Sequence, residues 1–198
     1  LREIHVGRTQ EAETNLLKDA NPQLLEGTGK VTVCVADTRL NELGEAIHYL
    51  LHYPYGCVEQ TTSSLLPWMV LNDLKDALPE LQKKRDQFHD AIQSGIRRLL
   101  SMQTESGGLA YWPGGREANL WGSAYGGMAL ALAHQQGHSV PIASVDQLTK
   151  YLSDQLRNTG NFQDNYELSQ RCLALYTLAL AGKAEPSYHE VMFQKRES

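Results

Sequence analysis

The decisive stretch of this sequence lies around Cys57, where a thiol stands three positions before a carboxamide. The stretch reads Tyr53-Pro54-Tyr55-Gly56-Cys57-Val58-Glu59-Gln60. Pro54 favours an extended approach and Gly56 relieves crowding where the chain turns, so a helix is expected to begin at about Cys57. Positions i and i+3 of a helix share a face, which brings the Cys57 sulfur and the Gln60 side-chain carbonyl carbon within bonding reach. The spacing therefore allows an internal thioester, formed with loss of ammonia from Gln60.

The residues of this pair allow three interpretations. In a thioester, Gln60 is the acyl donor and Cys57 the leaving group, while Glu59 either orients the Gln60 amide or interacts with the positive end of the helix dipole. A buried cysteine beside an exposed glutamine, in a helical protein-binding domain without a thioester, explains the same pair. A cysteine-nucleophile hydrolase, with Cys57 at a helix N-terminus and His48 or His52 as its base, is the third interpretation.

The composition is that of an ordinary globular protein. Its 198 residues, 41% of them hydrophobic, are enough for one large domain with a sizeable core. A net charge of −5 gives no basic surface for nucleic acid, and the three cysteines do not form a disulfide framework. No apolar stretch approaches the ~20 residues that cross a bilayer. We therefore expect no nucleic-acid partner, no direct membrane insertion of this segment and no cofactor.

From about residue 41 onward, apolar residues recur at helical spacing, with glycine or proline between the segments. The pattern predicts helices at 42–52, 57–78, 84–102, 121–136, 143–157 and 166–181, with a further one beginning near 187–195. Pro67 falls inside the second of these and predicts a kink, with a break as the alternative. Residues 4–6 and 31–35, in contrast, have the β-branched or alternating character of short strands.

One apolar pattern occurs twice in the helical part. Residues 128–133 precede Gly137 and residues 173–178 precede Gly182, and the two glycines are 45 positions apart. Helical pairs that repeat in this way bury their apolar stripes by stacking on their neighbours. The repeat therefore predicts a mainly α fold of stacked helical pairs, with the helices rich in alanine and leucine facing inward.

The longer run from Tyr53 to Ser63, which continues the stretch above with Thr61-Thr62-Ser63, closely resembles the thioester motif of the alpha-2-macroglobulin and complement family, especially its bacterial branch. Residues 43–51 resemble the helix before that motif. Residues 108–115 and 121–125 resemble the loop and helix that follow it. The resemblance covers roughly residues 30 to 182.

This resemblance implies a fold and a domain organisation. The family's thioester domain is an α/α toroid of about six helical pairs, inserted in a CUB-like β-sandwich. Residues 1–36 would then be the end of that sandwich, and residues 37–198 the N-terminal part of the toroid. The chain is expected to be a segment of a longer protein that holds about half of the ring, with apolar faces open to self-association.

The resemblance also implies covalent inhibition of endopeptidases instead of enzymatic turnover. A protease would cut a bait segment elsewhere in the parent chain and thereby uncover the thioester. A lysine of that protease would then be acylated by Gln60 as Cys57 leaves. The implied partners are proteases and the remaining domains of the parent chain. The implied location is the periplasm or cell envelope, with lipid anchoring of the parent left open.

A thioester that survives in water needs a dry, aromatic cover. We expect Tyr53 and Tyr55 to provide it, with Trp68 and Trp112 as further shielding residues. In the complement branch a downstream histidine attacks the thioester first. The matching stretch here, residues 158–166, contains no histidine, so the resemblance implies direct attack by amines such as protein lysines.

Two pairs of histidines have the spacing of helical metal ligands. His48 and His52, like His134 and His138, lie four residues apart. Gly137 indicates that a helix ends within the second pair, and neither pair belongs to a Cys-x-x-Cys or His-Glu-x-x-His motif. Solvent-exposed helix positions are therefore the preferred interpretation, and no metal site is predicted.

Overall fold

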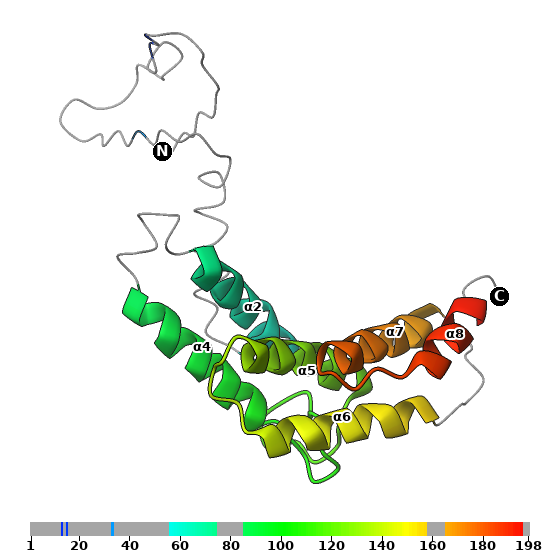
Figure 1. Cartoon of the computed structure of the whole chain (residues 1–198). Helices are drawn as coiled ribbons and strands as arrows, with labels where there is room; N and C mark the ends of the chain where they lie inside the picture. Colours follow the sequence, from blue (N-terminus) through cyan, green and yellow to red (C-terminus); the bar gives the residue numbers. More distant parts are fainter. Residues whose placement is uncertain are drawn as a thin grey trace, which may run out of the picture. The chain divides into compact units, whose positions relative to one another are not determined.

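The computed structural model describes Glu13, Asn15, Val33 and residues 56–74, 85–157 and 165–195. The chain divides into two compact units, Leu1–Asn41 and Glu42–Ser198. The described part of the second unit is mainly helical (Figure 1). The strands predicted at 4–6 and 31–35, the helix at 42–52 and the domain boundary near residue 36 lie outside the described residues, Val33 excepted, and stay predictions.

The described residues form six helices. They are α2 (Val58–Leu74), α4 (Arg85–Leu100), α5 (Leu120–Gln135), α6 (Ile142–Arg157), α7 (Asn165–Leu180) and α8 (Pro186–Lys195). These are the helices predicted from residue 57 onward, and their bounds agree within about two residues, except at the end of α2, where the predicted continuation to residue 78 is outside the described residues. α2 continues through Pro67, so the alternative of a break is excluded.

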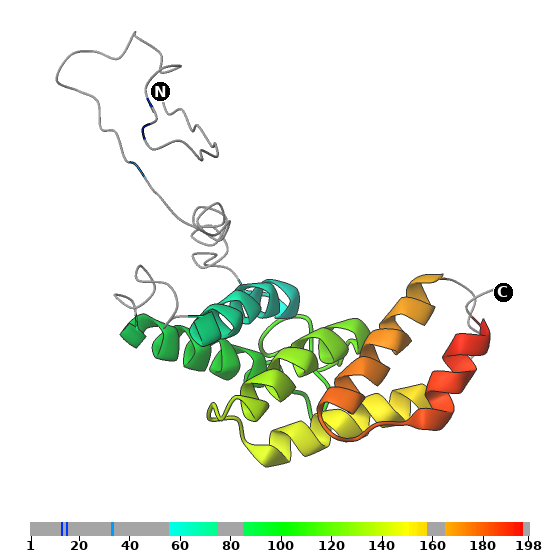
Figure 2. The same ribbon diagram turned by 45° about the horizontal axis from the view of Figure 1, so that its top comes forward.

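The six helices stack as successive pairs. α5 packs against both α2 and α7, and these three helices lie in one row (Figure 1). The remaining helices, α4, α6 and α8, each pack against one or two members of that row, which the turned view also shows (Figure 2). This arrangement confirms the mainly α fold of stacked helical pairs.

The predicted repeat corresponds to α5 and α7, which end in the same way. Gly137 and Gly182 both have a positive φ, +79° and +73°, a conformation that suits glycine because it has no Cβ. After each glycine, the next residue donates its N–H to a carbonyl five positions earlier: His138 to Ala133 at 2.9 Å and Lys183 to Leu178 at 2.8 Å. One sequence signal, an apolar helix followed by glycine, thus produces the same helix end twice.

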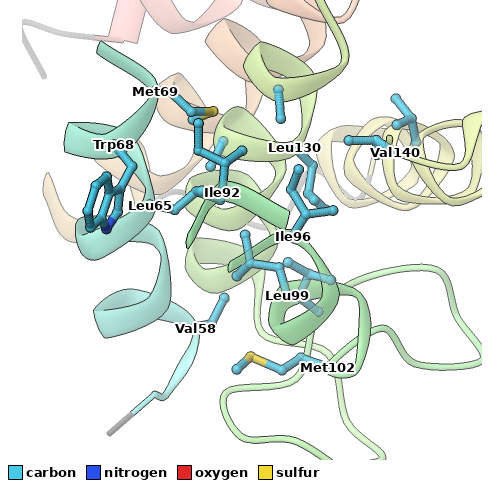
Figure 3. Packing of buried hydrophobic residues seen from close by; sticks show 14 of the residues in the cluster. Val58, Leu65, Trp68, Met69, Ile92, Ile96, Leu99, Met102, Leu130 and Val140 are labelled. Atoms are coloured by element: carbon cyan, nitrogen blue, oxygen red, sulfur yellow. The ribbon is translucent and has the colours of Figure 1, made fainter. Parts of the chain in front are cut away.

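The largest hydrophobic cluster lies between α2, α4 and α5 (Figure 3). Its fully buried side chains include Leu65 and Met69 of α2, Ile92, Ile96 and Leu99 of α4, and Leu130 of α5. A second cluster, between α5, α6, α7 and α8, contains Leu152, Leu156, Leu175 and Leu178. The first cluster reaches the start of α2, because Val58 belongs to it.

Arg171 ties α6 to α7. Its guanidinium group is buried and donates to the Glu167 carboxylate at 3.1 and 3.3 Å. The same group donates to the carbonyls of Gln155 and Leu156, in the last turn of α6, at 3.1 and 3.5 Å. A buried cation needs such partners, and the last carbonyls of a helix need such donors.

Val58, the first residue of α2, occupies a groove on α5 that two glycines leave open. A Cβ at Gly122 would lie 2.7 Å from Val58 Cγ1. A Cβ at Gly126 would lie 3.1 Å from Val58 Cγ2 and 2.6 Å from Leu109 Cδ1. Two of these three distances are below 3.0 Å, which real Cβ contacts essentially never show, and the third is tighter than most, so the glycines allow the start of α2 to approach α5 closely.

Replacing Gly126 by alanine tests this groove. Helix propensity favours alanine by about 1 kcal/mol, whereas overpacking a filled core costs roughly 1–3 kcal/mol. Because the added methyl group meets Leu109 at 2.6 Å, we expect the packing cost to exceed the propensity gain and the midpoint of thermal unfolding to fall. Gly95→Ala is the matched control, since its Cβ would meet only the Leu65 side chain, at 3.0 Å or more. A midpoint of thermal unfolding for Gly126→Ala at or above that of the unsubstituted protein would contradict the claim that close packing at Gly126 excludes a Cβ.

Candidate functional site

Cys57 and Gln60 hydrogen-bond to each other at the start of α2. Cys57 directly precedes Val58, the first helical residue, and therefore stands at the N-cap position. The Cys57 backbone N–H donates to Gln60 Oε1 at 3.3 Å, and the Gln60 backbone N–H donates to Cys57 Sγ at 3.5 Å. This is the reciprocal pattern of a capping box, with cysteine in place of serine or threonine. The helix start thus brings together the two side chains that the sequence predicted as a pair.

The turn that carries Cys57 is fixed from both sides. Arg98, an exposed residue of α4, donates to the Gly56 carbonyl from Nε at 3.3 Å and from NH2 at 3.1 Å. A Cβ at Gly56 would lie 2.6 Å from Thr61 Oγ1 and 3.3 Å from Arg98 Nε, so only glycine fits here without displacement. Cys57 itself is buried, and Gln60 is half-buried.

The loop between α4 and α5, residues 101–119, supplies the other side of the turn. The Tyr111 carbonyl oxygen accepts a hydrogen bond from the Val58 N–H at 3.0 Å, which satisfies one of the free donors of the α2 N-terminus. The loop is held by α5: the Leu109 N–H donates to Ser123 Oγ at 2.7 Å. Asn119 caps α5, because its Oδ1 accepts from the Gly122 N–H at 2.7 Å.

Tyr111 places an aromatic side chain beside Glu59, in the helical turn that carries the pair. Its hydroxyl donates to Glu59 Oε2 at 3.2 Å. The pKa of Tyr111 is raised to about 12, chiefly by its interaction with the nearby Cys57 side chain and the charge that this side chain can carry, and further by burial and the Glu59 carboxylate. The phenol therefore keeps its proton at neutral pH and acts as a hydrogen-bond donor beside the sulfur.

The aromatic residues predicted to shield the pair have different positions. Tyr53 and Tyr55 lie outside the described residues, as do His48 and His52. Trp68 belongs to the hydrophobic core, where its ring meets Phe88 edge to face at 5.0 Å. Since Trp68 lies eleven residues after Cys57, it is about 16 Å farther along α2. This position gives Trp68 a packing role instead of contact with the pair.

Trp112 follows Tyr111 in the loop and is 54% exposed, and its ring packs edge to face against Tyr111 at 6.0 Å. It therefore supports Tyr111 more directly than it covers Cys57. Tyr111 was not among the residues predicted to shield the pair, although it belongs to the aromatic residues around the motif. The sequence signal for Tyr111 was its position in the loop that resembles the family's loop after the motif. Its partner Glu59, however, lies 52 residues earlier, and no local pattern connects the two residues.

No group of three or more histidine, cysteine, aspartate or glutamate side chains in the described part of the chain could hold a metal ion. Gly137 ends the helix between His134 and His138, so that pair does not share a helix face. Within the same described ranges, no helix is both long enough and apolar enough to cross a membrane. Cys172 is a free, exposed cysteine.

The chain matches one known protein family. A family model described as the A-macroglobulin TED domain matches residues 31–189, most of the chain. The chain belongs to this family. The match begins close to the predicted start of the resemblance and includes the Cys57–Gln60 pair and the loop that carries Tyr111.

Two curated relatives are alpha-2-macroglobulins. The protein of Escherichia coli K12 is 29% identical over 191 residues, which are 92% of this chain and 11% of that protein. The protein of Rickettsia conorii is 22% identical over 179 residues, 90% of this chain and 9% of that protein. The chain thus spans about a tenth of the length of these relatives.

Solved structures agree. Native alpha-2-macroglobulin of Escherichia coli, from domain MG7 to the C-terminus, has a TM-score of 0.67 and 28% identity, covering 78% of this chain and 26% of that one. Salmonella alpha-2-macroglobulin reacted with methylamine has a TM-score of 0.64 and 28% identity, covering 78% of this chain and 11% of that one. The resemblance seen in the sequence is therefore confirmed, together with the α/α toroid class.

The pKa of Tyr111 gives a testable pH dependence. Because the raised value exceeds the ordinary pKa of about 10, the folded state retains the Tyr111 proton longer than the unfolded chain does. The contribution of this residue to stability is therefore complete below about pH 10 and is lost as the pH rises through about 12. At about pH 11, protein with a free Cys57 should show the same ionised-tyrosine absorbance as its Tyr111→Phe variant.

The control for this titration is Cys57→Ala, which removes the largest cause of the shift. In the Cys57→Ala background, Tyr111 should contribute to the ionised-tyrosine absorbance at about pH 11, so that the Tyr111→Phe substitution now lowers it. A Tyr111 that is already ionised at this pH in the presence of Cys57 would show that its hydroxyl does not interact with the sulfur.

Proposed function

We propose that Cys57 and Gln60 form an internal thioester and that this domain captures proteases covalently through their lysines. The observation that carries the proposal is the reciprocal hydrogen bonding of the pair: each side chain is directed at the backbone N–H of the other residue. Both reacting groups therefore lie in one helical turn before any bond forms, which reduces the entropic cost of closing the ring.

Formation of the thioester joins the Cys57 sulfur to the Gln60 side-chain carbonyl carbon and releases ammonia from Gln60. Negative charge develops on Gln60 Oε1 while the carbonyl carbon is tetrahedral. The Cys57 N–H already donates to this oxygen at 3.3 Å. A backbone donor at the positive end of a helix dipole stabilises such an oxyanion without reorganisation, so the helix start promotes the reaction.

Capture of a protease reverses the roles of the two side chains. A lysine amine attacks the thioester carbonyl, an amide forms between that amine and Gln60, and the carbon–sulfur bond breaks with its electron pair on Cys57 Sγ. The Gln60 N–H donates to Sγ at 3.5 Å and is placed to stabilise the departing thiolate. Each thioester reacts once, which makes the protein a suicide inhibitor with no turnover.

The relatives support proteases as the partners. Solved structures include alpha-2-macroglobulin of Escherichia coli activated by trypsin, at 30% identity over 73% of this chain with a TM-score of 0.61, and the same protein activated by porcine elastase. For this chain we propose that cleavage of a bait segment elsewhere in the parent protein exposes the thioester, that the other domains of the parent control the exposure, and that the parent acts in the periplasm or cell envelope.

A cysteine-nucleophile hydrolase is the second candidate, and it requires a base beside Cys57. Among the described residues, the Gln60 N–H donates to Cys57 Sγ at 3.5 Å, and the Tyr111 hydroxyl, which donates to Glu59, interacts with the same side chain. Both are donors, and neither can accept the thiol proton at neutral pH. His48 and His52, the bases considered for this candidate, lie outside the described residues, and multiple turnover on a small thiol-reactive substrate would favour it.

Methylamine tests the thioester directly. The native protein containing this chain should be about 17 Da lighter at the Cys57–Gln60 peptide than its sequence requires, and methylamine should add to Gln60 and release one thiol. Cys57→Ser should show neither the mass loss nor the thiol. Cys172→Ser removes an exposed free thiol away from the pair and should leave both the mass loss and the methylamine-released thiol unchanged, so it is the matched control. A native peptide without the mass loss would contradict thioester formation.

Covalent capture of trypsin tests the partner class. Mixing the parent protein with active trypsin should give a denaturant-resistant complex in which Gln60 is joined to a trypsin lysine by an amide bond. Methylamine pretreatment should abolish the complex, because the electrophile has been consumed. Adducts that are mainly esters, and therefore sensitive to hydroxylamine, would contradict direct attack by amines.

A further inference from the structure

We propose that the Tyr111 hydroxyl donates a hydrogen bond to the Cys57 sulfur as it leaves, and so accelerates acyl transfer from the thioester. This inference rests on the proposed function and assigns a role to a residue from a distant loop. It concerns the second half of the reaction, in which negative charge appears on sulfur.

The backbone holds Tyr111 in register with the first turn of α2. Its carbonyl oxygen accepts from the Val58 N–H at 3.0 Å, so the residue stands beside the peptide that joins Cys57 to Val58. The preceding residues Leu109 and Ala110 are fully buried and bonded: the Ala110 N–H donates to the Met102 carbonyl at 2.8 Å. The backbone that carries the Tyr111 ring is therefore held in place. A donor to a developing charge requires such preorganisation.

The hydroxyl has one proton and two candidate acceptors. The hydroxyl donates to Glu59 Oε2 at 3.2 Å, and it is close enough to the Cys57 side chain for that side chain to be the main cause of its raised pKa. A thioester sulfur is a weak acceptor, so in the intact bond the proton is expected to point at the Glu59 carboxylate. A thiolate is a strong acceptor, and hydrogen bonds to charged groups are about twice as strong as neutral ones. The proton can therefore turn to Cys57 as the charge forms.

The amine nitrogen forms an amide with the Gln60 carbonyl carbon, and the carbon–sulfur bond breaks with its electron pair on Cys57 Sγ. The amine loses one proton to solvent, and Tyr111 retains its own while donating it in a hydrogen bond. The pKa of Tyr111, raised to about 12, keeps this proton in place at neutral pH. Two donors then face the sulfur, the Tyr111 hydroxyl and the Gln60 N–H.

The test compares rates of thiol release by methylamine at neutral pH in the parent protein. Tyr111→Phe removes the hydroxyl and keeps the ring, and it should slow thiol release about tenfold, because a hydrogen bond to a charged group is lost. The thioester mass loss of this variant should match that of the unsubstituted protein. Tyr125→Phe is the matched control: its hydroxyl bonds Ser63 Oγ at 3.1 Å, and its loss should leave the rate unchanged.

A second variant makes the test independent of any effect of Tyr111→Phe on folding. Glu59→Gln weakens the competing acceptor, so the Tyr111 hydroxyl should donate its hydrogen bond to the sulfur more readily. Thiol release should then become up to threefold faster. In the Tyr111→Phe background, the same substitution should have no accelerating effect, because a double-mutant cycle reports the coupling of the two residues.

The outcomes separate this inference from the proposed function. A native protein without the mass loss at Cys57 and Gln60 would overturn both. An intact thioester that reacts at the same rate in Tyr111→Phe, or a Glu59→Gln acceleration that persists without the Tyr111 hydroxyl, would overturn the role of Tyr111 alone. Slower release in Tyr111→Phe with an unchanged rate in Tyr125→Phe would establish it.

Discussion

The reciprocal hydrogen bonds between Cys57 and Gln60 are the interaction on which the site depends. They are helix capping contacts: each residue satisfies a backbone N–H of the other at the start of α2. A serine or threonine at position 57 would cap the helix as well, but it would not supply a good leaving group. The same geometry that begins a helix therefore places a thiol and a carboxamide together, which is the arrangement that the proposed thioester requires.

Capping alone would leave this turn free to move, and the neighbouring elements fix it. Val58 enters the groove that Gly122 and Gly126 leave on α5, while Arg98 of α4 holds the Gly56 carbonyl. Both contacts are made at the two residues adjacent to Cys57. The helical pairs thus act as the rigid support of a site that consists of a single turn, which is where precise placement of reacting groups is most effective.

The sequence predicted much of this fold because its signals are local. Apolar periodicity located the helices from residue 57 onward, and the glycines at 137 and 182 marked two helix ends whose left-handed backbone needs a residue without a Cβ. The Cys57–Gln60 pair was predicted for the same reason, since three residues along a helix determine their own geometry. Trp68, in contrast, could be recognised as an aromatic residue but not assigned to the core, because its partner Phe88 belongs to another helix.

By itself the sequence determined the helical pairs and the thiol and carboxamide of the site, because hydrogen bonds along one helix and apolar repeats connect residues that are close in the chain. The tertiary structure alone decided which loop would pass the α2 N-terminus, and with it that Tyr111 would stand beside Glu59 and Cys57. That contact depends on how α5 holds the loop through Ser123 and Asn119, and so on packing between elements that no local pattern specifies.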